Sequence, residues 1–382
     1  MNRRILAGTH LFSGDEACAE GAIAAGCTLF AGYPITPATE ISERLSWRLF
    51  DVGGIFVQGA DELDSLTIVI GAVHAGAKAM TATSGNGICL MQECIGYAAI
   101  TEAPCVIVDV QRAGPATGIA TKTMQGDVYQ VRYGSNADYS IIALAPESSQ
   151  EMFDLTVEAF NLAEIYRVPV FILADEIIAH TREKVVIPKK VKVVSRKRPG
   201  VPPQEFIPFK VKSDTDVPPM PAFGEGYHLP VSGLTHTETG APSTEYKVQN
   251  SMVWRLVNKV EKRAGKLTKI ESLYLEDAEV LVLAYGSVGR VAKSAVIRAR
   301  EEGIKAGYLR LITIWPFPDQ AIRDAVRNGL KTVVVPEMNV GKVAREVTRA
   351  IRGGAEVISL PKPGVELHKP KEIYDLLRRV IK

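Results

Sequence analysis

The chain contains 382 residues, which exceeds one typical domain and predicts two or three. Its 45 Lys and Arg residues nearly balance its 43 Asp and Glu residues, so it lacks the strongly basic character of nucleic-acid-binding proteins. No segment approaches the ~20 consecutive apolar residues of a membrane span, and no signal-peptide pattern begins the sequence. We therefore expect a cytoplasmic protein that binds neither nucleic acid nor membrane.

Residues 1–190 alternate between apolar segments of strand length and longer segments with helical periodicity. Several strand segments are continuously apolar, as in strands that are buried on both faces of a parallel sheet. The predicted strands are 27–34, 54–60, 77–84, 103–111, 139–146 and 168–176, and the predicted helices are 15–26, 37–50, 61–76, 87–102 and 148–166. This alternation predicts an α/β domain with an open sheet.

Residues 191–268 interrupt this alternation. Their first part, 191–245, contains nine of the 22 prolines and shows no sustained periodicity. A structureless loop of this length is unusual inside a compact domain, so we expect a linker or an arm that lies over another surface. Alternation resumes in residues 269–382, which predicts a second, smaller α/β domain. Its predicted strands are 279–286, 307–314, 331–336 and 356–360, and its last predicted helix is 371–382.

The five cysteines are Cys18, Cys27, Cys89, Cys94 and Cys105, and no two of them form a C-x-x-C pair. This spacing argues against a four-cysteine iron–sulfur cluster or structural zinc site, so we predict no metal site in this chain. Because all five lie in apolar or glycine-rich segments, we expect buried thiols that serve packing.

The first candidate functional segment is G-Y-P-I-T-P, residues 32–37, which ends a predicted strand. Thr36 before Pro37 is the pattern of a helix N-cap followed by proline at the first helical position, and capping alone explains it. A hydroxyl at the carboxyl end of a strand also points toward the crevice in which α/β sheets bind ligands. One threonine can serve both purposes.

Two further candidates lie where predicted helices begin. Asp61 and Glu62 open an apolar helix, where acidic side chains suit the helix dipole. The alternative is that Glu62, beside apolar surface, binds a ring nitrogen of a cofactor. In T-A-T-S-G-N-G, residues 81–87, Gly85 and Gly87 permit a tight turn and the close approach of a ligand, although this signal is weak by itself.

Arg112 ends the strongest predicted strand and precedes a segment of small, turn-forming residues. A guanidinium in this place can bind a carboxylate through two parallel hydrogen bonds, but a surface arginine on a loop fits the pattern equally well. The sequence has neither G-x-G-x-x-G after its first strand nor G-x-x-x-x-G-K-[ST]. It therefore predicts no dinucleotide-binding turn and no nucleotide-phosphate loop.

Taken together, these segments resemble the alpha subunits of 2-oxoacid:ferredoxin oxidoreductases, most closely those of the 2-oxoglutarate type. The pairing of Y-P-I-T-P at 33–37 with Q-R-A-G-P-A-T-G at 111–118 is the most specific match. The other matches are G-D-E-A at 14–17, M-T-A-T-S-G at 80–85, Q-G-D at 125–127, P-M-P-A-F-G-E-G-Y at 219–227, S-G-L-T-H at 232–236, W-P-F-P at 315–318 and P-E-M-N at 336–339. The resemblance implies a thiamine pyrimidine-binding-type parallel-sheet domain and a transketolase C-terminal-like α/β domain.

The resemblance also implies a role for each candidate residue. Glu62 aligns with the catalytic glutamate that contacts the aminopyrimidine of thiamine diphosphate, where a carboxylate on the ring nitrogen stabilises the imino tautomer. Thr36 and Arg112 would bind the 2-oxoacid. The other residues expected at the cofactor are Tyr33, Ser84 and Gly85.

In this family, a partner beta subunit holds the diphosphate, Mg²⁺ and an iron–sulfur cluster, ferredoxin receives the electrons, and coenzyme A takes the acyl group. The present sequence lacks both the G-D-G…N pattern with which thiamine enzymes hold Mg²⁺ and the cysteines for a cluster. The resemblance therefore implies a hetero-oligomer with a beta subunit, with gamma and delta subunits as further candidates. Thiamine diphosphate would lie at the subunit interface, and the lone chain would be inactive.

The sequence departs from the family pattern around the expected pocket. Ala116 and Ala120 replace a serine and a proline of P-S-T-G-x-P-T, Asn86 replaces a proline, and Q-G-A-D precedes Glu62. These changes leave branched-chain 2-oxoacids and pyruvate open as substrates, and a scaffold subunit without catalytic role is the non-enzymatic alternative. A second basic residue would favour 2-oxoglutarate, because its second carboxylate needs a partner. Lys122 is the candidate, although a solvated lysine fits as well.

Overall fold

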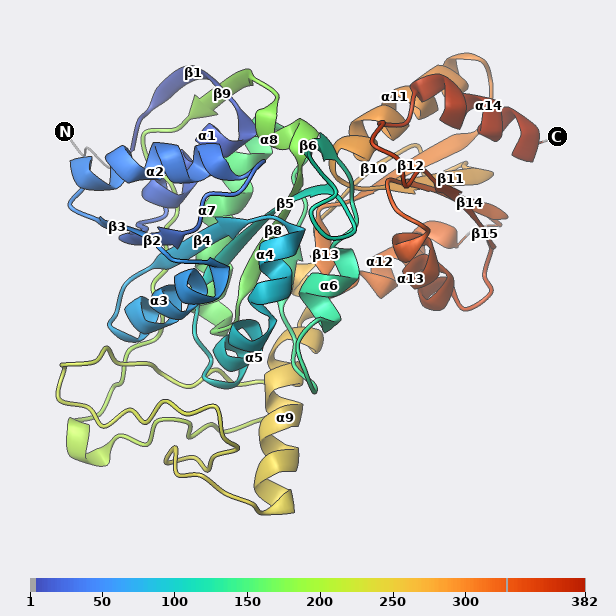
Figure 1. Ribbon diagram of the computed structural model, residues 1–382. Helices are drawn as coiled ribbons and strands as arrows, with labels where there is room; N and C mark the ends of the chain where they lie inside the picture. The colour runs from blue at the N-terminus through green and yellow to red at the C-terminus, as the bar shows by residue number, and fades with distance from the viewer. Residues whose placement is uncertain (1–4, 328, 382) are drawn as a thin grey trace.

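The computed structural model describes residues 5–327 and 329–381, and its first domain is built on a mostly parallel sheet (Figure 1). The parallel strands are β2 (Leu29–Gly32), β3 (Ile55–Gln58), β4 (Ala79–Thr83), β5 (Val106–Ala113), β7 (Ile142–Leu144) and β8 (Val170–Asp175). They lie in the order β7-β8-β5-β4-β2-β3. Every residue of β2, β4, β5, β7 and β8 is buried, which explains why the apolar runs in the sequence located them.

Helices cover both faces of this sheet. One face packs against α1 (Gly14–Ala24), α2 (Thr39–Asp51), α7 (Ser149–Tyr166) and α8 (Glu176–His180). The other face packs against α3 (Glu62–His74), α4 (Gly85–Leu90), α5 (Gln92–Ile100) and α6 (Val128–Tyr133). The predicted helix 87–102 is thus two helices, which meet at Met91.

Several short elements were absent from the sequence-based prediction. β1 (Gly8–Phe12) and β9 (Glu183–Ile187) form a separate antiparallel pair, and β6 (Ile119–Thr123) pairs antiparallel with β5. The expectation of five buried thiols is wrong for Cys89, which is exposed on α4, and Cys94 is partly exposed. Apolar neighbours in the sequence do not determine which side of a short helix faces solvent.

The segment after β9 contains a single turn of 3-10 helix, Pro203–Glu205, before α9 (Tyr246–Glu261) and α10 (Ala264–Leu267). Figure 1 shows it running beneath the first domain and then rising through α9. The segment is anchored at Arg196, whose guanidinium donates to Glu164 at 2.6 Å and to the carbonyls of Val73 and Ala77, each at 2.7 Å.

α9 is attached to the first domain through a buried carboxylate. Glu102 accepts hydrogen bonds from both terminal nitrogens of Arg255, at 2.8 and 2.7 Å, and from Lys259 Nζ at 2.8 Å. Burial alone would raise the pKa of Glu102, but Arg255, Lys259 and Arg167 hold it well below its ordinary value. The carboxylate is therefore ionised and neutralises buried cations.

Glu102→Gln should lower the free energy of unfolding by about 3–5 kcal/mol, because it leaves buried cations without their counter-ion. Urea denaturation of both proteins measures this. Glu276→Gln is the control, since Glu276 is exposed and its replacement should change stability by less than about 0.5 kcal/mol. If the two variants were equally stable, the buried carboxylate would not be what anchors α9.

The second domain contains a five-stranded sheet of β10 (Ile270–Leu273), β12 (Ala306–Leu311), β11 (Val280–Ala284), β14 (Thr332–Glu337) and β15 (Glu356–Pro361), given in spatial order. β10 is antiparallel to β12, and the other pairings are parallel. One face packs against α11 (Gly286–Glu301) and α14 (Pro370–Val380). The other packs against α12 (Asp319–Val326) and α13 (Lys342–Ile351).

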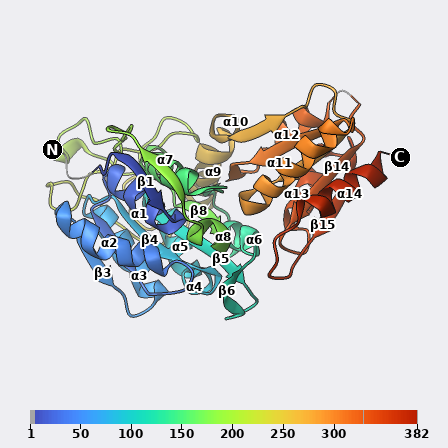
Figure 2. The ribbon, with the colours of Figure 1, turned by 90° about the horizontal axis from the view of Figure 1, so that it is seen from above.

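The two domains share a core and lie side by side in both views (Figures 1 and 2). The predicted strand 307–314 divides, because after β12 the chain forms β13 (Thr313–Trp315), which pairs antiparallel with β7 of the first sheet. One continuous hydrophobic cluster runs from the α3–α5 face of the first domain to the α12–α13 face of the second. Among the described helices, none is long and apolar enough to cross a membrane.

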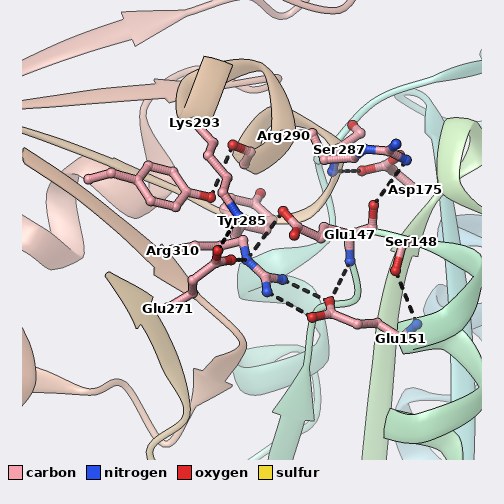
Figure 3. Close-up of polar contacts among 12 residues, drawn as sticks. Glu147, Ser148, Glu151, Asp175, Glu271, Tyr285, Ser287, Arg290, Lys293 and Arg310 are labelled. Atoms are coloured by element: carbon pink, nitrogen blue, oxygen red, sulfur yellow. Dashed lines mark hydrogen bonds and ion pairs between the residues drawn. The ribbon is translucent and has the colours of Figure 1, made fainter. Parts of the chain in front are cut away.

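Charged contacts reinforce the domain boundary (Figure 3). Arg310 in β12 donates two hydrogen bonds to Glu151 of α7, at 2.8 and 2.7 Å, and one to Glu271 of β10 at 2.9 Å. Asp175, at the end of β8, accepts from the backbone N–H of Ser287 in α11 at 3.0 Å. The Arg310–Glu271 bond lies within the second domain and orients Arg310. The contacts of Arg310 with Glu151 and of Asp175 with Ser287 cross the boundary and fix the second domain beside the carboxyl ends of the first sheet.

Candidate active site

The predicted site residues gather at one edge of the first sheet. Thr36 follows β2, Glu62 follows β3, Ser84 follows β4, and Arg112 is the penultimate residue of β5. The carboxyl ends of parallel strands meet at the same edge, which is where open α/β sheets bind ligands. The topology therefore places residues that are 76 positions apart in sequence, such as Thr36 and Arg112, in direct contact.

Arg112 is held by two oxygen atoms and is only 9% exposed. Its Nη1 donates to the backbone carbonyl of Thr36 at 2.6 Å, and its Nη2 donates to Oδ1 of Asn86 at 3.0 Å. Its Nε has no hydrogen-bond partner among the described residues. The surface-arginine alternative is therefore wrong, because this guanidinium is buried, oriented and still has a donor to offer.

Thr36 does not cap a helix. α2 begins at Thr39 with Ala38 as its N-cap, and no side chain caps it. The capping explanation of Thr36 is therefore wrong. Its carbonyl orients Arg112, and its partly exposed side chain is left available at the edge of the sheet.

Glu62 is the first residue of α3 and is 5% exposed. The N-cap of this helix is Asp61, whose side chain accepts from the Asp64 N–H at 2.8 Å, so Glu62 is not needed as a cap. Throughout residues 5–327 and 329–381, no hydrogen bond or ion pair involves its carboxylate. Although the residue is mostly buried, its two carboxylate oxygens are not sealed from solvent. They are therefore available to accept a hydrogen bond from an N–H group of a ligand.

The first turn of α4 joins Glu62 to Arg112. A Cβ on Gly87 would lie 2.5 Å from Cγ of Glu62 and 1.9 Å from Oγ1 of Thr83, so glycine is required for this close approach. Asn86, one residue earlier, holds Arg112. The Glu62 carboxylate and the Arg112 guanidinium therefore both lie against the first turn of α4.

A cavity of about 370 Å³ opens beside this turn. The polar side chains that line it include Asn86, Arg112, Asp127, Gln130 and Lys342. Burial raises the pKa of Asp127 to about 6, and the positive charges of Lys342 and Arg112 oppose that rise. The cavity thus brings together two cations and one carboxylate, and one of the cations comes from the second domain.

Sequence reasoning missed the part of the site that the second domain supplies. Gln125 is fully buried, its backbone N–H donates to the Met338 carbonyl at 3.0 Å, and its carbonyl accepts from Asn339 Nδ2 at 2.8 Å. The motifs Q-G-D and P-E-M-N therefore contact each other. Each was recognised separately, but residues more than 200 positions apart give no periodicity or spacing that would reveal their contact.

The remaining candidates occupy different environments. Lys122 is exposed on β6 and does not line the cavity. Tyr33 is 42% exposed after β2. Ser84 is fully buried as the N-cap residue of α4, and its Oγ lacks a partner within the described part of the chain. A Cβ on Gly85 would lie 2.8 Å from Oδ2 of Asp127, so a larger residue here would displace that carboxylate.

A histidine of α8, His180, contacts the segment that follows Thr36. His180 Nε2 lies 3.2 Å from the Pro37 carbonyl and 3.5 Å from Glu40, and its Nδ1 lies 3.4 Å from Glu176. The hydrogen bond to Glu176, together with the nearby charges of Glu40 and Asp15, raises the pKa of His180 from 6.5 to about 9. At neutral pH the ring is therefore a cation that links α8 to the start of α2.

His180→Gln should lower the free energy of unfolding by about 1–2 kcal/mol at pH 6. This value allows for solvent screening, because the His180 side chain is partly exposed. Because the folded-state pKa is raised, this stabilisation is complete below pH 6.5 and is lost as pH rises through 9. Denaturation at pH 6, 8 and 10 tests this. A difference between wild type and variant that stays constant over this range would show that the charge of His180 is unimportant.

Comparison with known proteins extends the likeness over nearly the whole chain. Residues 20–254 match the family described as pyruvate flavodoxin/ferredoxin oxidoreductase, thiamine diP-bdg. Residues 278–373 match pyruvate:ferredoxin oxidoreductase core domain II. The 2-oxoglutarate synthase subunit KorA of Methanothermobacter thermautotrophicus is 50% identical over 97% of this chain and 98% of that subunit. The ketoisovalerate oxidoreductase subunit VorB of the same organism is 36% identical over 97% of this chain and 98% of that subunit.

A solved structure supports the same assignment. The 2-oxoglutarate:ferredoxin oxidoreductase from Magnetococcus marinus, solved with 2-oxoglutarate, coenzyme A and succinyl-CoA bound, is 32% identical, with a TM-score of 0.91. The similarity covers 98% of the present chain but 65% of that longer chain. A split gene transketolase, 13% identical with a TM-score of 0.55, shares the fold alone. The chain therefore belongs to the pyruvate flavodoxin/ferredoxin oxidoreductase family, and within it to the alpha subunits of 2-oxoacid:ferredoxin oxidoreductases.

Proposed function

We propose that the chain is the alpha subunit of a 2-oxoglutarate:ferredoxin oxidoreductase. The reaction converts 2-oxoglutarate and coenzyme A into succinyl-CoA and CO₂, and the released electron pair reduces ferredoxin. The observation that carries this proposal is the placement of a partner-free carboxylate, Glu62, and an oriented guanidinium, Arg112, on either side of the first turn of α4. The identity of 50% to a 2-oxoglutarate synthase subunit supports the choice of substrate.

The surroundings of Glu62 fit the pyrimidine ring of thiamine diphosphate. The residue is only 5% exposed, and its carboxylate has no partner among the described residues, so it can accept a hydrogen bond from a ring N–H. Gly87 lets the backbone of α4 lie directly against the Glu62 side chain. When bound, thiamine diphosphate supplies the electron sink for decarboxylation. We assign to Glu62 the role of holding a proton at the ring nitrogen, and we place Tyr33, Ser84 and Gly85 beside the cofactor.

Arg112 and Thr36 are suited to bind the 2-oxoacid. A guanidinium gives short, strong hydrogen bonds to a carboxylate. Because Asn86 and the Thr36 carbonyl already hold two of its nitrogens, little orientational freedom is lost when substrate binds. Arg112 thus grips the carboxylate next to the oxo group, and the hydroxyl of Thr36 contacts the same end of the substrate.

The rest of the reaction requires partner subunits. We infer that a beta subunit holds the diphosphate, Mg²⁺ and the iron–sulfur cluster, because this sequence has no motif for any of them. Gamma and delta subunits, ferredoxin and coenzyme A complete the proposed set of partners, and the assembly is cytoplasmic. A scaffold without catalytic role would not need an available buried carboxylate.

Turnover by the complex of this chain with its beta subunit tests the proposal. The complex is supplied in turn with 2-oxoglutarate, pyruvate and 2-oxoisovalerate, and coenzyme A-dependent reduction of ferredoxin is recorded. We expect the highest kcat/KM with 2-oxoglutarate. Preference for 2-oxoisovalerate would instead place the chain with its ketoisovalerate relatives, and failure with every 2-oxoacid would refute the proposed reaction.

A further inference from the structure

We propose that Lys342, from the second domain, binds the distal carboxylate of the substrate and thereby selects dicarboxylic 2-oxoacids. This inference rests on the proposed function and deepens it, since it assigns substrate choice to a residue outside the pyrimidine-binding domain. Lys342 takes the place that Lys122 was expected to fill, because Lys122 is exposed and lies outside the cavity.

Lys342 and Arg112 line the same cavity of about 370 Å³. Asp127 lies close enough to both for their charges to act on it. The cavity therefore presents two cationic groups against one carboxylate, which leaves it with excess positive charge. A dianion with one carboxylate on Arg112 and a second on Lys342 would complement this arrangement, whereas a monocarboxylate would leave Lys342 without an anionic ligand.

The position of Lys342 is closely determined. Oδ1 of Asn339 accepts from the N–H groups of Gly341, at 2.9 Å, and Lys342, at 2.8 Å. The Lys342 carbonyl accepts from the Tyr129 hydroxyl of the first domain at 2.8 Å, and its Nζ donates to the Gly126 carbonyl. An ammonium group has three donors, so after this contact others remain for a ligand in the cavity.

The helix position of Lys342 does not by itself favour a lysine. Lys342 is the first residue of α13, where the helix dipole disfavours positive charge. The same helix end is already satisfied by Glu337, whose carboxylate accepts from the N–H groups of Val343 at 2.8 Å and Ala344 at 2.9 Å. An anion bound in the cavity would compensate the unfavourable placement of Lys342.

The test compares 2-oxoglutarate with 2-oxobutyrate in the complete complex carrying Lys342→Gln. We expect kcat/KM for 2-oxoglutarate to fall about 30-fold, equivalent to about 2 kcal/mol, as for the loss of a charged hydrogen bond. The loss should lie mainly in KM, and 2-oxobutyrate should be nearly unaffected. Lys342→Arg keeps the charge and should retain most of the discrimination. Lys122→Gln is the matched control and should behave like wild type.

The outcomes separate this inference from the proposed function. If wild type prefers 2-oxoglutarate and Lys342→Gln keeps the same ratio of kcat/KM values, or loses both substrates equally, the role of Lys342 is refuted while the proposed function stands. If the wild-type complex oxidises no 2-oxoacid, or prefers a monocarboxylic one, the proposed function fails and the inference fails with it. Co-purification with the beta subunit and thermal melting show whether Lys342→Gln is damaged structurally. If it is, the substrate preference of Lys342→Arg tests the inference instead: retained preference for 2-oxoglutarate supports it, and lost preference refutes it.

Discussion

Glu62→Gln in the assembled enzyme should reduce kcat by about 10²- to 10⁴-fold, the range over which positioned proton-transfer groups contribute. Glutamine preserves the size of the side chain but cannot hold a proton at the ring nitrogen as a carboxylate does. The chain should still fold, since Glu62 makes no hydrogen bond or ion pair within the described residues. The measurement is 2-oxoglutarate-dependent ferredoxin reduction, with thermal melting as a check on folding.

A second acidic residue at a helix start provides the control for this prediction. Glu93 lies in the first turn of α5 and is exposed. If Glu62 served only the helix dipole, Glu62→Gln and Glu93→Gln would both change stability slightly and leave turnover intact. Full activity of Glu62→Gln would therefore remove Glu62 from the catalytic site.

Arg112→Gln should lower kcat/KM by about 30- to 1000-fold for every 2-oxoacid, because a desolvated charged contact is worth about 2–4 kcal/mol. This pattern differs from that of Lys342→Gln, since all 2-oxoacids share the carboxylate that Arg112 would bind. Arg112→Lys keeps the charge but cannot reproduce the fork held by Asn86 and the Thr36 carbonyl, so it should recover a minor part of the loss. Steady-state kinetics with 2-oxoglutarate and pyruvate measure both variants. Unchanged kcat/KM in Arg112→Gln would contradict the assignment.

The buried strands were predictable because a strand that is buried on both faces has a continuous run of apolar residues. The strands β5, β8 and β11 were found in this way. β13 was not, since the chain leaves one sheet after Leu311 and joins another at Thr313 without any change in hydrophobicity. Pairing between segments that are distant in sequence is decided by tertiary packing. The local pattern of apolar residues gives no information about it.

The candidate site divides in the same way. Thr36, Glu62 and Arg112 were identified from strand ends and motif resemblance, and the fold places them around the first turn of α4. Their catalytic and binding roles remain predictions. Lys122, which is close to Arg112 in sequence, was the candidate for a second basic residue that binds substrate. The structure instead places Lys342 in the cavity, held there by contacts with Gly126 and Tyr129. Nearness in sequence to Arg112 thus pointed to a lysine that does not line the cavity.

The central claim is that the active site is divided between this chain and a beta subunit. The most direct measurement is thiamine diphosphate binding in the presence of Mg²⁺, by titration calorimetry, to the isolated chain, the isolated beta subunit and the complex of the two, with turnover recorded in parallel. We predict weak or undetectable binding and no turnover for the isolated chain, and tight binding with 2-oxoglutarate-dependent ferredoxin reduction for the complex. Tight binding and full turnover by the isolated chain would contradict the account.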